Sequence, residues 1–229
     1  MMRVWAIIPV KPLRDSKSRL SGILGADQRA GLTASILERT LAILNETAAV
    51  ERALVVSRDP AVLKIGRLGG ALTFGEGDRQ GLNAALMRAS AIATARRAQG
   101  LLILPADLPF LTLADVQMML NAAGDSVGPL RAQTNLAPAM AICPDYETDG
   151  TNALLICPPA GFDYQFGPSS FRAHLEEAAR LGLARRIVHA PGIKFDLDTA
   201  DDWALYQALT PDAGLASSPT AGAREMRVV

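Results

Sequence analysis

The stretch VWAIIPVKPLRDSKSRL, residues 4–20, joins a short apolar run to a basic loop near the start of the chain. The run Val4–Pro9 is too short for a helix and rich in β-forming residues, so it is predicted to be a buried strand. The loop after it carries Lys11, Lys17 and Arg19. Three cations on one loop can hold a polyphosphate, although a solvated basic loop would have the same composition.

Outward from this strand, short apolar runs alternate with helical patterns through the first half of the chain. We expect further strands at residues 53–57, 71–74 and 101–104, and helices from Asp27, up to Gly69-Gly70, over 81–99 and from Thr112. This order predicts parallel strands joined by right-handed helical crossovers. The fold class is therefore α/β, with a mostly parallel, doubly wound sheet and helices on both faces.

The second half is less regular. Strands are expected at residues 139–143, 152–157, 186–190 and 194–197, with helices after Ser170 and from Thr199. A polar loop separates the first two of these strands, which favours a mixed or antiparallel portion of the sheet. After residue 208 the composition shifts to Ala, Gly, Ser, Pro and Thr, so we expect one domain over 1–208 and a disordered tail over 209–229.

The overall composition narrows the class of protein. The chain has 229 residues, of which 49% are hydrophobic, so it can bury a core. Its 23 basic and 23 acidic residues balance, which argues against a nucleic-acid binder. No apolar run reaches the roughly 20 residues of a membrane helix, and no cleavage site follows the apolar start. Two cysteines in apolar runs predict buried thiols in a reducing cytoplasm.

Aspartates stand at two further places where the predicted strands end. Asp107 lies between two prolines after the most apolar strand, and Asp196 and Asp198 lie two residues apart on a segment expected to be extended. Carboxylates gathered on one side suit a hard divalent cation. The alternatives are a turn-capping aspartate at Asp107 and an acidic helix N-terminus after Asp198.

Two turn-forming stretches, residues 149–154 and 166–171, complete the candidate site. Ser169 and Ser170 open a predicted helix, whose free N–H groups can bind a carboxylate or a phosphate. Ordinary loops remain the alternative for both stretches. Together with the basic loop and the aspartates, they describe an anion pocket beside a carboxylate metal site.

The motifs IPVKPL, KSRL, LPADLP, DGTNAL, FGPSSF followed by a histidine, and DLD occur in this order between residues 3 and 207. They resemble the guanylyltransferases of deazaflavin coenzyme biosynthesis. The resemblance implies a glycosyltransferase-A-like nucleotidyltransferase fold. It also implies that GTP is joined, with release of pyrophosphate, to 3-phospho-D-glycerate, phosphoenolpyruvate or 2-phospho-L-lactate.

The resemblance assigns three sets of residues. The implied ligands of Mg²⁺, two ions per site, are Asp107, Asp196 and Asp198. The implied nucleotide-binding residues are Pro9, Val10, Lys11, Lys17, Arg19, Glu76, Gly81, Leu82 and Asn83. The implied acid-binding residues are Thr151, Gly167 and Ser170. Asn152 and Ser169 are added as candidates because the pocket is expected where Thr151-Asn152 faces the turn at 167–170.

The implied reaction is attack by a phosphate oxygen of the acid on the α-phosphorus of GTP. That oxygen is already anionic, so no general base is needed, and the barrier is the approach of two polyanions. Mg²⁺ with Lys11, Lys17, Arg19 and Asp107 would lower it. No catalytic His, Cys or Ser triad is evident, and His174 is expected to be structural.

Two departures from the family pattern concern the acid substrate. Ser169 stands where the family usually has glycine, and extra residues occur around 128–137. A hydroxyl at Ser169 could bond a hydroxyl of the substrate, which slightly favours 3-phosphoglycerate over the other two acids. If Ser169 merely caps the helix, this preference disappears.

Two other functions remain open at the level of the sequence. One is a nucleotidyltransferase that uses a different NTP and another small phosphate or sugar phosphate. The other is a non-catalytic nucleotide-binding protein on the same fold. If the enzyme is a guanylyltransferase, its product is a reactive diphosphate diester, so hand-off to a downstream transferase is a further expectation.

Overall fold

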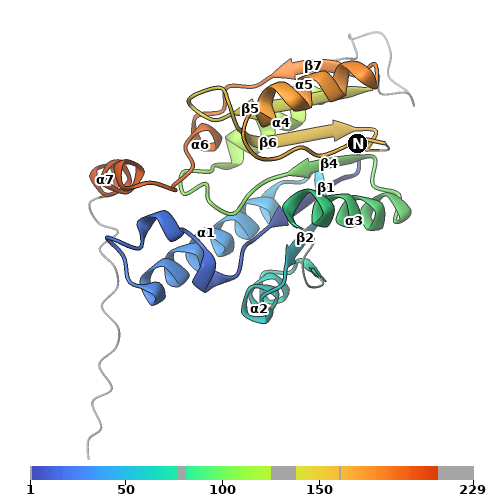
Figure 1. The fold of residues 1–229 in the computed structure, drawn as a ribbon. Coiled ribbons are helices and arrows are strands. Elements are labelled where there is room, and N and C mark those ends of the chain that lie inside the picture. Colours follow the sequence, from blue (N-terminus) through green and yellow to red (C-terminus); the bar gives the residue numbers. More distant parts are fainter. Residues whose placement is uncertain (1, 77–80, 125–137, 160, 211–229) are drawn as a thin grey trace, which may run out of the picture.

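The computed structural model describes residues 2–76, 81–124, 138–159 and 161–210. A seven-stranded sheet forms the centre of the molecule, in the order β3-β2-β1-β4-β6-β5-β7 (Figure 1). Its strands are β1 (Val4–Pro9), β2 (Val50–Ser57), β3 (Leu72–Gly75), β4 (Gly100–Ile103), β5 (Ala139–Pro144), β6 (Thr151–Cys157) and β7 (Ala184–Ile187). The predictions about residues 128–137 and about most of the tail concern segments outside the described residues.

The helices follow the predicted order, except that α6 was not predicted. They are α1 (Ala26–Glu46), α2 (Pro60–Leu68), α3 (Gly81–Ala95), α4 (Leu113–Gly124), α5 (Ser170–Arg180), α6 (Pro191–Lys194) and α7 (Ala200–Leu209), with the 3₁₀ turns η1 (Leu13–Asp15) and η2 (Ser18–Leu20). Their starts match local signals in the sequence. Asp59 caps α2 by accepting a hydrogen bond from the Ala61 N–H at 2.8 Å, and Thr112 accepts one from the Asp115 N–H at the start of α4.

The pairing of the strands confirms a mostly parallel sheet with a mixed second half. β1 is parallel to both β2 and β4, and β2 is parallel to β3. β6 runs antiparallel to β4 and β5, while β5 and β7 are parallel. The antiparallel strand is the one that follows the polar loop after β5, as the short connection requires.

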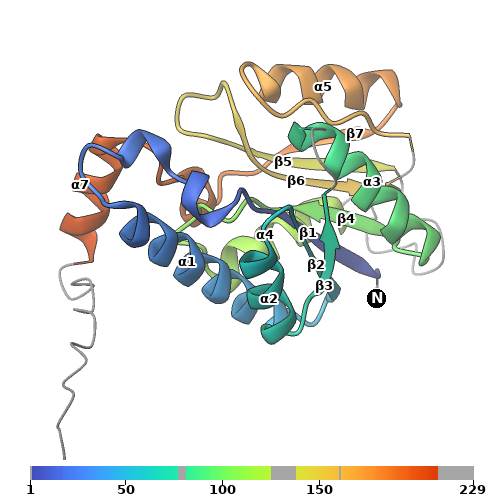
Figure 2. The same ribbon diagram turned by 60° about the horizontal axis from the view of Figure 1, so that its bottom comes forward.

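Each face of the sheet is covered by its own helices (Figure 2). Along β1, Val4, Ala6 and Ile8 pack on one face with α1, α2 and α4. Trp5 and Ile7 pack on the other face with α3 and α5. Side chains alternate across a strand, so a strand buried on both faces must be apolar throughout, which explains the continuous run in β1.

One predicted strand is wrong. Residues 194–197 do not form a strand, because α6 occupies Pro191–Lys194 and the chain after it pairs with no strand. Side chains take up the backbone groups here: Asp115 accepts from the Gly192 N–H at 3.1 Å. The Asn152 amide donates to the carbonyls of Ile193 and Lys194 at 3.0 and 3.1 Å. The segment therefore needs no sheet partner.

The carboxyl ends of β1, β2, β3 and β4 lie at one edge of the sheet. The chain runs from β1 outward to β2 and β3, then returns to β4 on the opposite side of β1. This reversal is the switch point where open α/β sheets bind ligands. The acidic segment, residues 195–198 before α7, is attached to the basic loop by a small apolar cluster. Its members are Leu20, Leu24, Ile36, Phe195, Leu197 and Trp203. In the described part of the chain, no helix is long and apolar enough to cross a membrane.

Candidate active site

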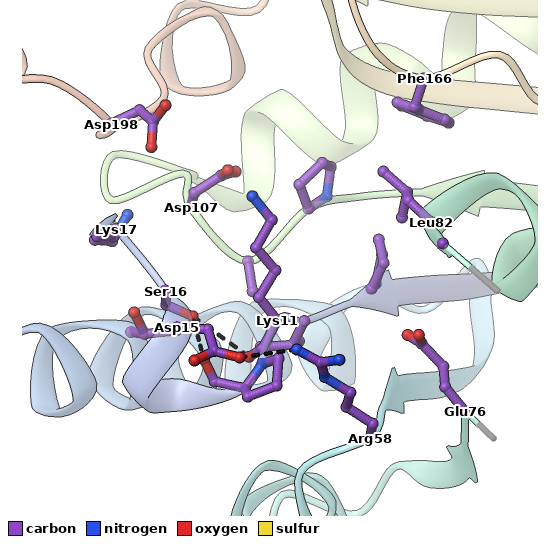
Figure 3. A pocket seen from close by; sticks show the side chains of 17 residues that line it. Lys11, Asp15, Ser16, Lys17, Arg58, Glu76, Leu82, Asp107, Phe166 and Asp198 are labelled. Atoms are coloured by element: carbon purple, nitrogen blue, oxygen red, sulfur yellow. Dashed lines mark hydrogen bonds and ion pairs between the residues drawn. The ribbon is translucent and has the colours of Figure 1, made fainter. Parts of the chain in front are cut away.

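A cavity of about 470 Å³ opens at this edge (Figure 3). Its walls come from the ends of the four parallel strands, from the loop after β1 and from the start of α3. The lining residues are Pro9, Val10, Lys11, Pro12, Asp15, Ser16, Lys17, Thr33, Arg58, Glu76, Gly81, Leu82, Pro105, Ala106, Asp107, Phe166 and Asp198. Nine of the residues that the sequence singles out are among them.

Lys17 and Asp107 form the polar centre at one end of the cavity. The Lys17 side chain is buried and its Nζ donates to the Leu197 carbonyl at 2.6 Å. The Leu197 N–H donates to the Asp107 carbonyl at 3.0 Å. One residue of the acidic segment therefore joins the basic loop to the end of β4. Lys11 points into the same space, nearer the middle of the cavity (Figure 3).

The Asp107 carboxylate is desolvated and lies close to Lys17 and Asp198. Burial raises the pKa of Asp107, Lys17 lowers it, and the nearby Asp198 raises it again. Burial also lowers the pKa of Lys17, an effect that Asp107, Asp198 and Asp196 oppose. Lys17 is thus a buried cation that depends on the carboxylates around it.

Asp196 and Asp198 lie on a segment that forms no strand, and their contacts differ although both lie near Lys17. Asp198 lines the cavity and forms an ion pair with Arg19 at 2.8 Å. Asp196 does not line the cavity and accepts a hydrogen bond from the Asn152 amide at 3.2 Å. Burial and the neighbouring Asp107 raise the pKa of Asp196 to about 6.

The acidic start of α7 has a separate, structural role. The Asp202 carboxylate accepts from the N–H groups of Asp198 and Thr199, at 3.0 and 2.7 Å, and Thr199 caps the helix in return. The helix cap is therefore formed by Thr199 and Asp202, which are different residues from the metal candidates Asp196 and Asp198.

The other end of the cavity presents Glu76, Gly81, Leu82 and Phe166. Glu76 directly follows β3, and its N–H donates to the Ser57 carbonyl at 3.0 Å. Burial raises the pKa of Glu76, while Arg88 and Arg58 lower it. A carboxylate at the end away from the lysines is suited to accept hydrogen bonds from a ligand that carries N–H groups.

Arg58 is a cavity residue that sequence analysis missed. It forms an ion pair with Asp15 of the basic loop at 2.8 Å, and both residues line the cavity. Its position directly after β2, at the same sheet edge as the ends of β1 and β4, was the signal that could have identified it.

Three predicted residues, Arg19, Asn83 and Asn152, are not part of the cavity lining. Arg19 is largely exposed and pairs with Asp198. Asn152 secures the end of α6, as described above. Asn83 bonds the main chain of Phe166 on both sides: its Oδ1 accepts from the Phe166 N–H at 2.8 Å, and its Nδ2 donates to the Phe166 carbonyl at 3.1 Å.

The residues expected to bind the acid lie together, beside the cavity rather than in its lining. The Thr151 and Ser170 hydroxyls are 3.3 Å apart and buried. Gly167 and Ser169, both with positive φ, form the turn before α5. The structure therefore brings Thr151 against the turn at 167–170, as the sequence predicted.

His174 is the buried centre of this second cluster. Its Nε2 accepts from the Gln165 N–H at 3.0 Å, so the proton of the neutral ring is on Nδ1, which lies 3.0 Å from the Thr151 hydroxyl. Burial lowers the pKa of His174 from the usual 6.5 to about 4, and the nearby Glu177 carboxylate partly opposes this. His174 is thus a buried, neutral link between the Gln165 backbone and the Thr151 hydroxyl.

This pKa predicts a pH dependence of stability. Between pH 6.5 and 4 the unfolded chain binds a proton at His174 that the folded chain does not. The free energy of unfolding should therefore fall with decreasing pH by up to about 1.4 kcal/mol per pH unit from this residue. Urea unfolding between pH 4.5 and 7 should show a shallower slope for His174→Gln than for the wild type. Equal slopes would contradict a buried neutral ring.

The carboxylates suit a metal ion that substrate phosphates help to bind. In the described ranges, no group of three or more His, Cys, Asp or Glu side chains could hold a metal by itself. Mg²⁺, however, is commonly bound by one or two carboxylates with phosphate and water oxygens. Asp107 and Asp198 are close enough for one to raise the pKa of the other, and they fit that role.

Comparison with known proteins identifies the family of the chain. A family model described as guanylyl transferase CofC like matches residues 3–206, nearly the whole of the described chain. The chain belongs to this family. The guanylyl transferase family was the one indicated by the sequence motifs, and an enzyme that transfers a nucleotidyl group is confirmed over a non-catalytic binding protein.

Curated relatives match over similar lengths. A phosphoenolpyruvate guanylyltransferase of Rubrobacter xylanophilus is 44% identical over 207 residues, which cover 90% of this chain and 95% of the relative. A protein of the same name from Conexibacter woesei is 34% identical, with 88% of this chain and 86% of the relative covered. Similarity to these guanylyl transferases thus extends over the cavity, the acidic segment and the turn at 167–170.

The fold is shared more widely. The crystal structure of 4-diphosphocytidyl-2C-methyl-D-erythritol synthase from Anaerococcus prevotii superimposes with a TM-score of 0.61 at 11% identity, covering 92% of this chain and 99% of the other. The nucleotidyltransferase fold expected of a guanylyl transferase is therefore confirmed.

Proposed function

We propose that this enzyme transfers a guanylyl group from GTP to phosphoenolpyruvate, with Mg²⁺ and with release of pyrophosphate. The observation that carries the proposal is the different set of charged groups at the two ends of the cavity. Lysines and aspartates occupy one end, where phosphates would bind, and Glu76 occupies the other, where a base would bind. Similarity to relatives named phosphoenolpyruvate guanylyltransferase supports phosphoenolpyruvate as the acid substrate.

The charge of the cavity supports a role for divalent cations. Three cationic residues, Lys11, Lys17 and Arg58, line the cavity together with four carboxylates, Asp15, Glu76, Asp107 and Asp198. With these groups ionised, the lining alone has a net charge of −1. A nucleoside triphosphate and a phosphorylated acid would both be repelled unless cations entered with them. Mg²⁺ bound by Asp107 and Asp198 would neutralise charge on the leaving pyrophosphate.

The residues of the chain orient and stabilise the reactants. Lys17, anchored on the Leu197 carbonyl, places a fixed positive charge at the phosphate end, and the exposed Lys11 adds a second one. These charges would hold the α-phosphorus of GTP in line with the attacking phosphate oxygen of the acid. That oxygen is anionic at neutral pH, so the mechanism requires no general base.

The contacts of Ser169 do not support the expected preference for 3-phosphoglycerate. Its hydroxyl donates to the Asp149 carboxylate at 3.1 Å, and its N–H donates to the same carboxylate at 3.0 Å. With φ at 56°, Ser169 occupies the left-handed region that glycine adopts most easily. The hydroxyl is thus already paired within the turn, and the basis for expecting a hydroxylated substrate is removed.

The function is tested by measuring pyrophosphate release from GTP with each of the three acids. We expect phosphoenolpyruvate to give the highest kcat/KM, and the same ranking in Ser169→Gly, because the Ser169 hydroxyl contacts Asp149. Absence of turnover with all three acids would reject the proposal. A ranking that changes in Ser169→Gly would restore a role for this hydroxyl in substrate choice.

Glu76 should select guanine. The base carries adjacent donors at N1 and its exocyclic amino group, and a carboxylate can accept from both. Glu76→Gln should raise KM for GTP by about tenfold or more and should reduce the preference for GTP over ITP, which lacks the amino group. Steady-state kinetics with both nucleotides measure this. Glu38→Gln, on an exposed position of α1, is the matched control, and an unchanged GTP-to-ITP ratio in Glu76→Gln would remove Glu76 from the base site.

We further propose that the enzyme works in the cytoplasm and passes its product to a downstream transferase. Cys143 and Cys157 are free and buried, which suits a reducing compartment. The proposed product is a diphosphate diester, which is reactive enough for direct transfer to be useful.

A further inference from the structure

The segment that carries Phe166 is held in place by side chains. Residues 162–166 connect β6 to α5 without forming a helix or strand, yet Phe166 lines the cavity. An irregular segment beside a cavity must find partners for its backbone groups elsewhere. Here, side chains of α3 and α5 supply them.

Asn83 satisfies both backbone groups of Phe166. It accepts from the N–H at 2.8 Å and donates to the carbonyl at 3.1 Å. Asn83 is the third residue of α3, directly after Gly81 and Leu82, which line the cavity at the proposed nucleotide end. Its amide therefore ties that end of the cavity to Phe166.

His174 holds the same segment from the other side. Its Nε2 accepts from the Gln165 N–H, and its ring packs edge-on against the Phe166 ring with centroids 4.8 Å apart. Its Nδ1 donates to Thr151, which in turn contacts Ser170. One buried ring thus contacts both the wall of the cavity and the residues expected to bind the acid.

We propose that Asn83 and His174 are positioning residues that fix Phe166 between the two substrates, Asn83 at the nucleotide end and His174 toward the acid. An apolar side chain could fill the same volume, but it would leave the backbone of Gln165 and Phe166 unpaired. Phe166 would then be free to leave the cavity wall. The inference rests on the proposed function for the identity of the two substrates.

Three variants test the hydrogen bonds of Asn83 and His174 separately. Asn83→Ala removes both bonds to Phe166. His174→Asn keeps a donor near Thr151 but loses the acceptor for Gln165, whereas His174→Gln keeps the acceptor and loses the donor. We expect Asn83→Ala and His174→Asn to raise KM for GTP by about five- to tenfold, and His174→Gln to raise KM for the acid by a similar factor. In each variant kcat should change less than KM.

Asn45→Ala is the matched control. Asn45 donates to the Gly69 carbonyl at 2.9 Å, a bond similar to that of Asn83 but between α1 and the end of α2. Its loss should lower the urea midpoint and leave both KM values unchanged. If Asn83→Ala and the His174 variants behave like Asn45→Ala, the network serves stability alone and the inference is wrong.

Binding of GTP distinguishes failure of the inference from failure of the proposed function. Absence of turnover in the wild type with all three acids would reject the function. Titration calorimetry of GTP with the wild type and Asn83→Ala would still decide the inference at the nucleotide end. A Kd raised about five- to tenfold in the variant supports it, and an unchanged Kd, or no binding to the wild type, overturns it.

Discussion

Replacement of Asp107 by asparagine should lower kcat/KM for guanylyl transfer by about a thousandfold or more. Asp107 lies at the end of β4 beside Lys17 and Asp198, and burial raises its pKa. Asparagine keeps the size of the side chain but removes the charge that would attract a divalent cation. The loss should therefore appear in Mg²⁺-dependent turnover.

The fold of the Asp107→Asn variant should be retained. The folded-state pKa of Asp107 is raised, so ionisation of this carboxyl opposes folding at neutral pH. Removing the charge also relieves repulsion from Asp198. We expect an unchanged or higher Tm without Mg²⁺. Mg²⁺ and GTP together should raise the Tm of the wild type and should not raise that of the variant.

Asp201→Asn is the control for this prediction, since Asp201 is exposed in the first turn of α7. It should keep wild-type turnover. Wild-type turnover in Asp107→Asn as well would exclude Asp107 from the metal site.

The sequence predicted the sheet because its signals were local. The apolar run of β1 and the Asp59-Pro60 start of α2 each specify an element within a few residues, and the β-α order then fixes the parallel half. The carboxyl edge follows from that order, so the positions of Lys11, Lys17 and Asp107 in one cavity could also be anticipated.

The hydrogen-bond partners of individual polar side chains could not be predicted, because these partners are far away in the sequence. Asn83 bonds a backbone 83 residues later, and Asn152 bonds carbonyls more than 40 residues later. A family motif can mark such residues as important without distinguishing a ligand contact from a bond to the main chain. The erroneous strand at 194–197 has the same origin, because the amide of Asn152 replaces a sheet partner there.

Replacement of Lys17 by methionine should damage both catalysis and stability. Methionine keeps most of the volume of the side chain but removes the ammonium that donates to Leu197 and faces Asp107, Asp196 and Asp198. Loss of one partner from a buried charge cluster costs about 3–5 kcal/mol, because the remaining charges are left uncompensated. We also expect kcat/KM to fall by about a hundredfold or more and GTP binding to weaken by about 1–3 kcal/mol.

Lys11→Met separates the two effects. Lys11 lines the same cavity but is exposed, and it donates no hydrogen bond to the acidic segment among the described contacts. The Lys11→Met substitution should weaken GTP binding, as measured by titration calorimetry, without lowering the urea midpoint. The structure thus predicts different roles for two lysines of one loop. Lys11 should contribute only to substrate binding, whereas Lys17 should contribute to substrate binding and to the stability of the fold.

Added Mg²⁺ gives a final test of this difference. If Lys17 compensates the carboxylates in the way a bound cation would, then millimolar Mg²⁺ should restore part of the lost stability of Lys17→Met and have a smaller effect on the wild type. Turnover should not recover to the same extent, because the ammonium proposed to contact the phosphates is still missing. Equal Mg²⁺ effects on both proteins would show that the aspartates around Lys17 do not bind the metal.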